Sequence, residues 1–136
     1  MSFILDTLPT TKEFFCDFWN KRPFVVRGMI SKEIMVALID KDHLAGLSME
    51  EEVESRLIRK GRKPNDWKCD YGPFQEKDFA ELGEEDWSLL VQNTDKHHDE
   101  TAELLKCFNF TPRWLLDDIM VSFSSKGGTV GAHIDS

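Results

Sequence analysis

Gly127-Gly128-Thr129-Val130-Gly131-Ala132-His133-Ile134-Asp135 is the stretch that decides how this chain is interpreted. Its glycines predict a turn, and the residues after them predict a strand that leads away from the turn. On a strand, side chains two positions apart point to the same face. The imidazole of His133 and the carboxylate of Asp135 would then reach one point together, which predicts that they share a metal ion.

A histidine and a carboxylate at this spacing make up two thirds of the 2-His-1-carboxylate triad that holds non-heme Fe(II) in oxygenases. The third ligand would be a distal histidine, and the sequence ends at Ser136 before supplying one. We therefore expect an incomplete iron site, which binds the metal weakly on its own. A frayed polar terminus is the alternative interpretation of the same two residues.

A second pattern of the same kind, His97-His98-Asp99, has a different interpretation. The residues that follow it predict a helix, and on a helix positions i and i+2 do not share a face. Thr94 or Asp95 suits the cap of this helix, and Asp99 suits its positive N-terminal end. We interpret His97 and His98 as solvated residues at the start of the helix rather than as metal ligands.

The composition indicates one globular domain. The 136 residues suffice for a single modest core, and 40% apolar with 31% charged residues is typical of soluble proteins. No apolar run approaches the roughly 20 residues of a membrane helix. The first residues lack the basic and apolar segments of a signal peptide. We therefore expect a cytoplasmic protein that does not enter a membrane.

The three cysteines, Cys16, Cys69 and Cys107, are odd in number and widely spaced, with no CxxC pair among them. This pattern suggests neither a zinc site nor a disulfide framework. Buried free thiols are the simplest prediction.

The formal net charge of −8 argues against direct binding of nucleic acid, which needs basic patches that face the phosphates. An acidic protein attracts a basic partner or substrate through its electrostatic field. Solubility alone is the alternative explanation of the charge.

Helical patterns come first along the chain and short strands dominate later, which predicts an α+β fold without an internal domain boundary. We expect helices over 11–20, after a cap at Ser31, over 42–47, 79–82 and 99–107. We expect strands over 24–27, 53–59, 67–71, 87–92 and 117–124.

The strand expected over 117–124 has two unlike faces. One face is apolar, and the other carries Asp118, Met120, Ser122 and Ser124. In a barrel with a covered exterior, the mixed face would line an interior pocket, where polar groups orient a ligand among apolar contacts. A half-exposed strand with its polar side in water is the alternative.

Six blocks of the sequence, taken together and in order, resemble one family. They are residues 19–23, 52–57, 72–74, 87–92, 117–124 and 127–135, and they span nearly the whole chain. The family is that of the bacterial ribosomal oxygenases, which are cupin or JmjC-type hydroxylases dependent on Fe(II) and 2-oxoglutarate. Ala132 departs from the proline expected at this position in the family.

The resemblance implies a fold and a chemistry. Residues 1–136 would be the N-terminal part of one catalytic domain, with N-terminal helices and the first strands of a double-stranded β-helix, or jelly roll. The close bacterial members hydroxylate an arginine of a large-subunit ribosomal protein, while 2-oxoglutarate is converted to succinate and CO₂. The blocks favour this arginine type over histidine hydroxylation by resemblance only.

The resemblance also implies roles for particular residues. His133 and Asp135 would be the metal ligands, and Asp118 would pair with the substrate guanidinium, since arginine and carboxylate form charge-assisted hydrogen bonds. Met120 would form a wall of the pocket, and Ser122 would lie near the cosubstrate. The acidic charge agrees with this partner, because ribosomal proteins are basic.

The family continues into a second iron-binding histidine, a basic residue that binds 2-oxoglutarate, a helical dimerisation region and a winged-helix-like domain, which this sequence does not include. We therefore expect a homodimer for the complete protein and an inactive fragment for these 136 residues. The alternative is a non-catalytic acidic module that binds a basic ribosomal protein segment without metal.

Overall fold

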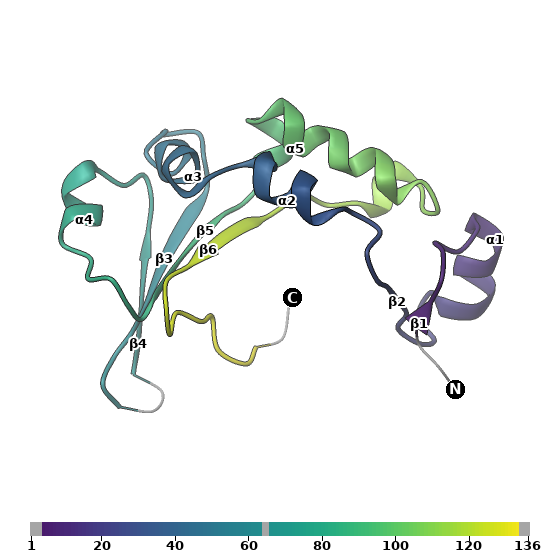
Figure 1. Cartoon of the computed structure of the whole chain (residues 1–136), viewed down its shortest axis with the longest axis horizontal. Coiled ribbons are helices and arrows are strands. Elements are labelled where there is room, and N and C mark those ends of the chain that lie inside the picture. Colours follow the sequence, from purple (N-terminus) through teal and green to yellow (C-terminus); the bar gives the residue numbers. More distant parts are fainter. Residues whose placement is uncertain (1–3, 64–65, 134–136) are drawn as a thin grey trace.

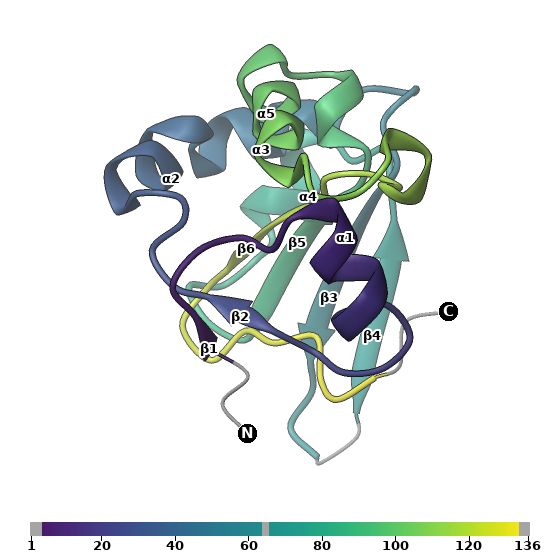
Figure 2. The same cartoon turned by 90° about the vertical axis from the view of Figure 1, so that its right-hand side faces the viewer.

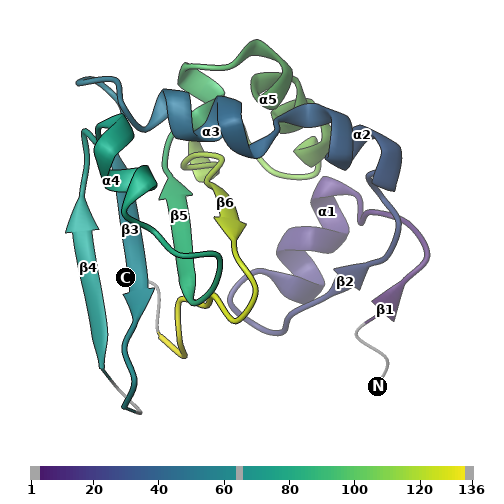
Figure 3. The ribbon, with the colours of Figure 1, turned by 60° about the vertical axis from the view of Figure 1, so that its left-hand side comes forward.

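A four-stranded antiparallel sheet with the strand order β4-β3-β5-β6 forms the centre of the computed structural model, which describes residues 4–63 and 66–133. Figure 3 shows the four strands side by side. They are β3 (Ser55–Lys60), β4 (Trp67–Tyr71), β5 (Trp87–Val91) and β6 (Val121–Ser124). The strands predicted over 53–59, 67–71 and 87–92 are confirmed to within two residues at each end.

One face of the sheet, here called the core face, carries Leu57, Leu89 and Phe123 as direct cross-strand partners. Helices α3 (Lys41–Leu47) and α4 (Glu76–Ala80) lie on this side (Figure 1). The buried core gathers here, because alternate apolar residues of the strands meet side chains from α3 and from the loops. It consists of Leu44, Val53, Leu57, Phe74, Leu89 and Val91.

The opposite face, here called the cavity face, carries Arg56, Leu90 and Ser122 as the next row of cross-strand partners. The part of the chain from β1 to β2, here called the N-terminal unit, lies on this side of the sheet (Figures 1 and 2). The residues after β6, here called the C-terminal segment, lie on the same side.

The N-terminal unit pairs β1 (Ile4–Leu5) with β2 (Val25–Val26) in parallel. The helix predicted over 11–20 is confirmed at its start. Thr10 caps α1 (Thr11–Glu13) through a capping box with Glu13, but the helix then continues as a π-helix over Phe14–Phe18. The strand predicted over 24–27 is confirmed as the shorter β2.

The remaining helices follow the predicted order. Ser31 caps α2 (Lys32–Leu38), as predicted, by accepting a hydrogen bond from the Ile34 N–H. The helix predicted over 99–107 is α5 (Asp99–Leu104) with a 3₁₀ turn at Leu105–Phe108. Further 3₁₀ turns lie at Thr94–Lys96 and Arg113–Leu115. No helix in the described part of the chain has the length and apolar character needed to cross a membrane.

Two predicted strands differ from the structure. The strand predicted over 117–124 begins only at Val121, because Asp118 and Ile119 bond to the segment after β5 instead of to a strand. The turn predicted at the glycines is confirmed at Gly127, but the strand predicted after it is wrong as far as residue 133, because the segment is irregular there. Gly127 and Gly131 both have positive φ there, which interrupts an extended backbone.

The predicted state of the cysteines and histidines is partly wrong. All three cysteines are free, but Cys16 and Cys69 are exposed rather than buried. His98 does stand at the start of α5, but its side chain is only 9% exposed, so it is not solvated. The His98 ring itself accepts from the Thr101 N–H and caps the helix in place of Thr94 or Asp95.

Candidate functional site

A cavity of about 800 Å³ lies on the cavity face and brings together most of the predicted site residues. Four of them line it, although they lie in the residues before β6, in β6 itself and in the irregular C-terminal segment: Asp118, Met120, Ser122 and His133. Asp135, the second predicted metal ligand, lies outside the described residues. The cavity therefore unites the polar side of the 117–124 segment with the histidine of the C-terminal stretch.

Asp118 is held in a defined orientation by the main chain. Its Oδ2 accepts a hydrogen bond from the Asn93 N–H at 2.7 Å, and Asn93 itself has a left-handed backbone with φ of 53°. Asp95 acts in the same way from the other side, since its Oδ1 accepts from the Ile119 N–H at 2.9 Å. These bonds fix the two carboxylates beside the end of β5, so that Asp118 enters the cavity from a rigid support.

Met120 and Ser122 project from the start of β6 and the residue before it. Met120 is 47% exposed, and Ser122 stands opposite Leu90 on β5. The thioether provides an adaptable apolar wall, and the hydroxyl can donate and accept a hydrogen bond. Both side chains can therefore contact a ligand in the cavity.

His133 reaches the cavity because the C-terminal segment folds back over the cavity face. Gly131 lies beside Trp67 of β4, where an added Cβ would make only an ordinary contact of 3.6 Å with Cζ2, and its φ of 69° is what favours glycine there. The His133 Nδ1 lies 3.1 Å from the Gly131 carbonyl oxygen. A ring that donates from Nδ1 to a carbonyl carries its lone pair on Nε2, which is the arrangement of a histidine metal ligand.

His133 is the one predicted metal ligand among the described residues. Within residues 4–63 and 66–133, no group of three or more His, Cys, Asp and Glu side chains is placed to hold a metal ion. His133 fits as one ligand by its position and its ring bond. The other described histidines lie elsewhere, and His43 and His98 pack together with ring centroids 4.8 Å apart. The interpretation of His98 as a non-ligand agrees with its capping bond.

The sequence analysis missed four polar residues of the cavity, one of which, Asp117, directly precedes the predicted Asp118. Glu54 and Arg56 enter it from β3 and the residue before that strand, and Gln92 follows the end of β5. Alternation along 53–59 was the available signal, since it places Glu54, Arg56 and Ile58 on one face of a strand. The cavity thus contains three carboxylates, those of Glu54, Asp117 and Asp118, and one guanidinium.

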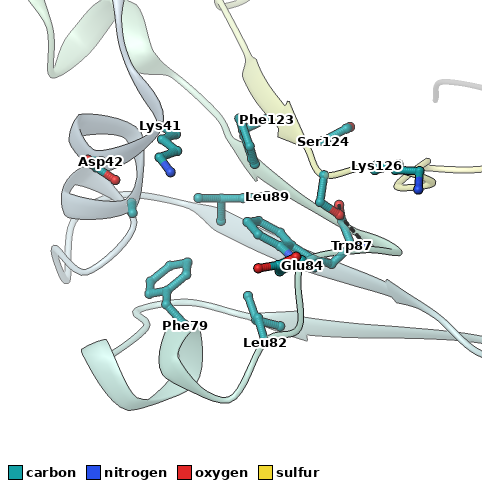
Figure 4. Close-up of a pocket in the computed structure, with 12 residues that line it drawn as sticks. Lys41, Asp42, Phe79, Leu82, Glu84, Trp87, Leu89, Phe123, Ser124 and Lys126 are labelled. Atoms are coloured by element: carbon teal, nitrogen blue, oxygen red, sulfur yellow. Dashed lines mark hydrogen bonds between the residues drawn. The ribbon is translucent and has the colours of Figure 1, made fainter.

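A second cavity, of about 460 Å³, opens on the core face and contains none of the predicted site residues (Figure 4). Trp87, Leu89 and Phe123 line it, and all three belong to the hydrophobic core or pack against it. Four charged residues also line it, namely Lys41, Asp42, Glu84 and Lys126, and Lys126 pairs with Glu85 at 2.7 Å. This cavity is a depression in the core packing rather than a polar site.

Two curated proteins are similar to this chain in sequence. The ribosomal protein uL16 3-hydroxylase of Escherichia coli (strain K12) is 44% identical over 117 residues, which cover 86% of this chain and 30% of that protein. The probable ribosomal oxygenase of Haemophilus influenzae is 38% identical over 135 residues, which cover 99% of this chain and 32% of that protein. The chain therefore spans about a third of the length of these relatives. No family model matches the sequence.

Solved structures of the Escherichia coli ribosomal oxygenase YcfD are similar in fold. Each has a TM-score of 0.79 and 40% sequence identity, over 95% of this chain and 34% of that chain. One is a complex with cobalt and succinic acid, and another is a complex with cobalt and 2-oxoglutarate. The mixed helix and strand fold is thus that of part of an oxygenase. More particularly, the chain matches a fragment of the ribosomal oxygenase family, which confirms the resemblance seen in the sequence.

Proposed function

We propose that this chain is the N-terminal part of an Fe(II)- and 2-oxoglutarate-dependent oxygenase that hydroxylates an arginine side chain of a large-subunit ribosomal protein. The observation that carries the proposal is the cavity that gathers Asp118, Met120, Ser122 and His133 on one face of the sheet. The uL16 hydroxylase relative and the YcfD complexes with cobalt and 2-oxoglutarate support the same chemistry. On this view β3 to β6 are the first strands of a truncated cupin or JmjC-like jelly roll, and residues 1–136 lie within a single domain.

The metal site would combine His133 and Asp135 of this chain with a third ligand from outside it. Bound Fe(II), together with 2-oxoglutarate, would supply the activation of O₂. The part of this chain is to place a neutral imidazole at the cavity wall. The bond between His133 Nδ1 and the Gly131 carbonyl supports that part, because it orients the ring.

The substrate guanidinium would bind at Asp118. The Asn93 N–H leaves the carboxylate of Asp118 fixed before the substrate arrives, which reduces the entropy lost on binding. Met120 would pack along the aliphatic part of the arginine side chain, and the Ser122 hydroxyl would contact 2-oxoglutarate. Together they would hold the target carbon in one orientation, which is the main contribution a protein makes to such a reaction.

The partner would be a basic segment of the ribosomal protein rather than nucleic acid. The net charge of −8 favours a cationic partner, and three carboxylates line the cavity itself. We further propose that the complete protein acts in the cytoplasm as a homodimer.

A chimera tests the proposal directly. This chain would replace the matching segment of the Escherichia coli uL16 3-hydroxylase, and mass spectrometry would follow an arginine-bearing peptide in the presence of Fe(II) and 2-oxoglutarate. We expect the peptide to gain the mass of one oxygen atom on its arginine with the chimera and no change with the 136-residue chain alone.

A pair of matched variants of the chimera tests the role of Asp118. Asp118→Asn should lower kcat/KM by about tenfold or more, because a charge-assisted bond to the substrate is lost. Asp42→Asn, at an exposed position on the core-face cavity, should leave kcat/KM unchanged. Turnover by the isolated chain, or full activity of Asp118→Asn, would contradict the proposal.

The second candidate function is a non-catalytic module that binds a basic ribosomal segment. The three carboxylates of the cavity favour it, because they offer negative charge to a basic segment. Binding of the peptide that is insensitive to EDTA, combined with a chimera that never hydroxylates it, would select this second function.

A further inference from the structure

Arg56 is the residue of the cavity whose bonding is least complete. It is the second residue of β3 and faces the cavity, opposite Leu90. Its Nη2 donates to Oε1 of Gln92 at 3.0 Å. Its Nε is buried and has no acceptor in the described part of the chain. No ion pair joins the guanidinium to any described carboxylate.

The other arginine of the strand, Arg59, also has a buried Nε without an acceptor, but it differs from Arg56 in having an ion pair. Arg59 projects to the opposite face, where its guanidinium pairs with Asp70. Arg56 has no ion-pair partner within 4 Å among the described residues. Buried polar groups in folded proteins are nearly always bonded, and an exception calls for a missing water, ion or ligand. Arg56 thus requires an acceptor that the described residues do not supply.

The position of Arg56 relates it to the site proposed for the substrate side chain. Arg56 bonds the side chain of Gln92, and Asp118 bonds the main chain of the next residue, Asn93. Adjacent Cα atoms are only about 3.8 Å apart. The guanidinium of Arg56 and the carboxylate of Asp118 are therefore supported from neighbouring points at the end of β5.

The charge of the cavity decides which kind of acceptor fits Arg56. Three carboxylates already face a single guanidinium there, so a further carboxylate would meet net repulsion. A main-chain carbonyl oxygen is a strong acceptor without net charge. A polypeptide that places a cationic side chain on Asp118 brings its own carbonyl groups to the same end of the cavity.

We propose that Arg56 binds a main-chain carbonyl group of the polypeptide substrate, next to the residue whose side chain enters the cavity. The inference rests on the proposed function in that it places the basic substrate in the same cavity. Asp118 would then recognise the side chain, and Arg56 would recognise the backbone that carries it. The substrate class is accordingly an arginine within a polypeptide, not free guanidinium compounds.

A hydrogen bond from Arg56 to a carbonyl and a purely electrostatic role of Arg56 predict opposite changes in peptide affinity when Arg56 is removed. If Arg56 only adds positive charge to the cavity, its removal should strengthen the binding of every cation. If Arg56 donates to a carbonyl, its removal should weaken the binding of a peptide. It should leave unchanged or strengthen the binding of a guanidinium compound that has no carbonyl.

The test uses the 136-residue chain without metal and two probes. One is a short peptide with a single arginine among glycine and lysine residues, and the other is ethylguanidinium. NMR titrations would give Kd for the chain, for Arg56→Met and for Arg56→Lys, with Arg62→Gln in the exposed turn as the charge-matched control. Circular dichroism would confirm that each variant is folded.

We expect Arg56→Met to raise the peptide Kd about tenfold or more, since a bond to a charged donor is lost. Arg56→Lys should raise it less, because the ammonium keeps the charge but not the planar fork. Ethylguanidinium should bind Arg56→Met at least as well as the unchanged chain. Arg62→Gln should not lower the affinity for either probe.

Peptide binding that is absent in the unchanged chain, or that is unchanged or tighter in Arg56→Met, would overturn the inference. Succinate serves as a third probe, because loss of succinate binding with unchanged peptide binding would make Arg56 a carboxylate site instead. Asp118→Asn separates this inference from the proposed function. One outcome is that Asp118→Asn leaves ethylguanidinium binding intact while Arg56→Met still weakens peptide binding. In that case the assignment of Asp118 as the guanidinium site is wrong, and the role of Arg56 stands.

Discussion

The two faces of the β4-β3-β5-β6 sheet are built from alternate residues of the same strands, yet they have opposite characters. On the core face Leu57 and Leu89 are each only 2% exposed. On the cavity face Met120 is 47% exposed, and Arg56 and Asp118 stand among the apolar residues. One face therefore contributes stability through burial of apolar area, and the other keeps polar groups available for a ligand.

The two arginines of β3 show the same difference within a single strand. Arg59 lies on the core side and forms an ion pair with Asp70, whereas Arg56 lies in the cavity without one. Both arginines have a buried Nε without an acceptor, so the ion pair is what distinguishes them. A guanidinium without an ion pair at a cavity wall indicates a requirement other than stability. The comparison thus separates the residues that hold the fold from those that serve the site.

The largest expected difference between the faces is in the effect of truncating adjacent side chains of β3. Leu57→Ala should lower the free energy of unfolding by about 2–5 kcal/mol, because it leaves a void in the core. Ile58→Ala, on the half-buried cavity face, should lower it by less than about 1.5 kcal/mol, since water can enter the space. Urea unfolding followed by circular dichroism measures both values.

Equal losses of unfolding free energy in Leu57→Ala and Ile58→Ala would contradict the difference between the two faces, because they would mean that the cavity face is packed as tightly as the core. Leu89→Ala provides the matched control on β5, since Leu89 is the direct cross-strand partner of Leu57. It should resemble Leu57→Ala rather than Ile58→Ala.

The next effect is a predicted gain in stability. Arg56→Met removes a guanidinium whose Nε is buried without an acceptor, and it keeps most of the aliphatic stem. Leaving a buried polar group unbonded costs about 1–3 kcal/mol, so the variant should be more stable by up to that amount. Thermal or urea unfolding of Arg56→Met and Arg59→Met measures the contrast. Arg59 also has a buried Nε without an acceptor, but Arg59→Met loses the ion pair with Asp70 and should therefore be less stable than Arg56→Met. A loss in Arg56→Met as large as that of Leu57→Ala would refute the distinction.

Local patterns were enough to predict most of the sheet, and long-range bonds explain where they failed. The 67–71 strand was predicted with its observed ends, because alternation and the flanking turns are encoded next to it. The start of β6 was placed too early, since Asp118 and Ile119 bond to residues after β5 that are distant in sequence. The π-helix at Phe14–Phe18 has the same apolar stripe as an α-helix, so the sequence did not distinguish them.

The candidate site was predicted in part for a similar reason. Asp118, Met120, Ser122 and His133 do meet in one cavity, although the strand expected to carry His133 is an irregular segment. Arg56 was missed, because it belongs to β3, and only the pairing of β3 with β5 brings it to the cavity. Asp135 lies outside the described residues, so its role as a metal ligand stays a prediction.

The smallest effect concerns the ion pair on the core side. The hydrogen bond from Arg59 is the main reason that the pKa of Asp70 lies below its usual value, with Lys68 as a weaker contributor. A depressed pKa in the folded state means that the stabilisation is present above the unfolded pKa, near 3.9, and disappears as the pH falls through the folded value. Because both partners are partly exposed, Asp70→Asn should cost less than about 1 kcal/mol at pH 7 and nothing at a pH below the folded pKa, where Asp70 is protonated in both states. Urea unfolding at both pH values measures this difference, and in an Arg59→Met background most of its pH dependence should vanish. A difference that persists undiminished at low pH would show that Asp70 stabilises the core side by packing rather than by charge.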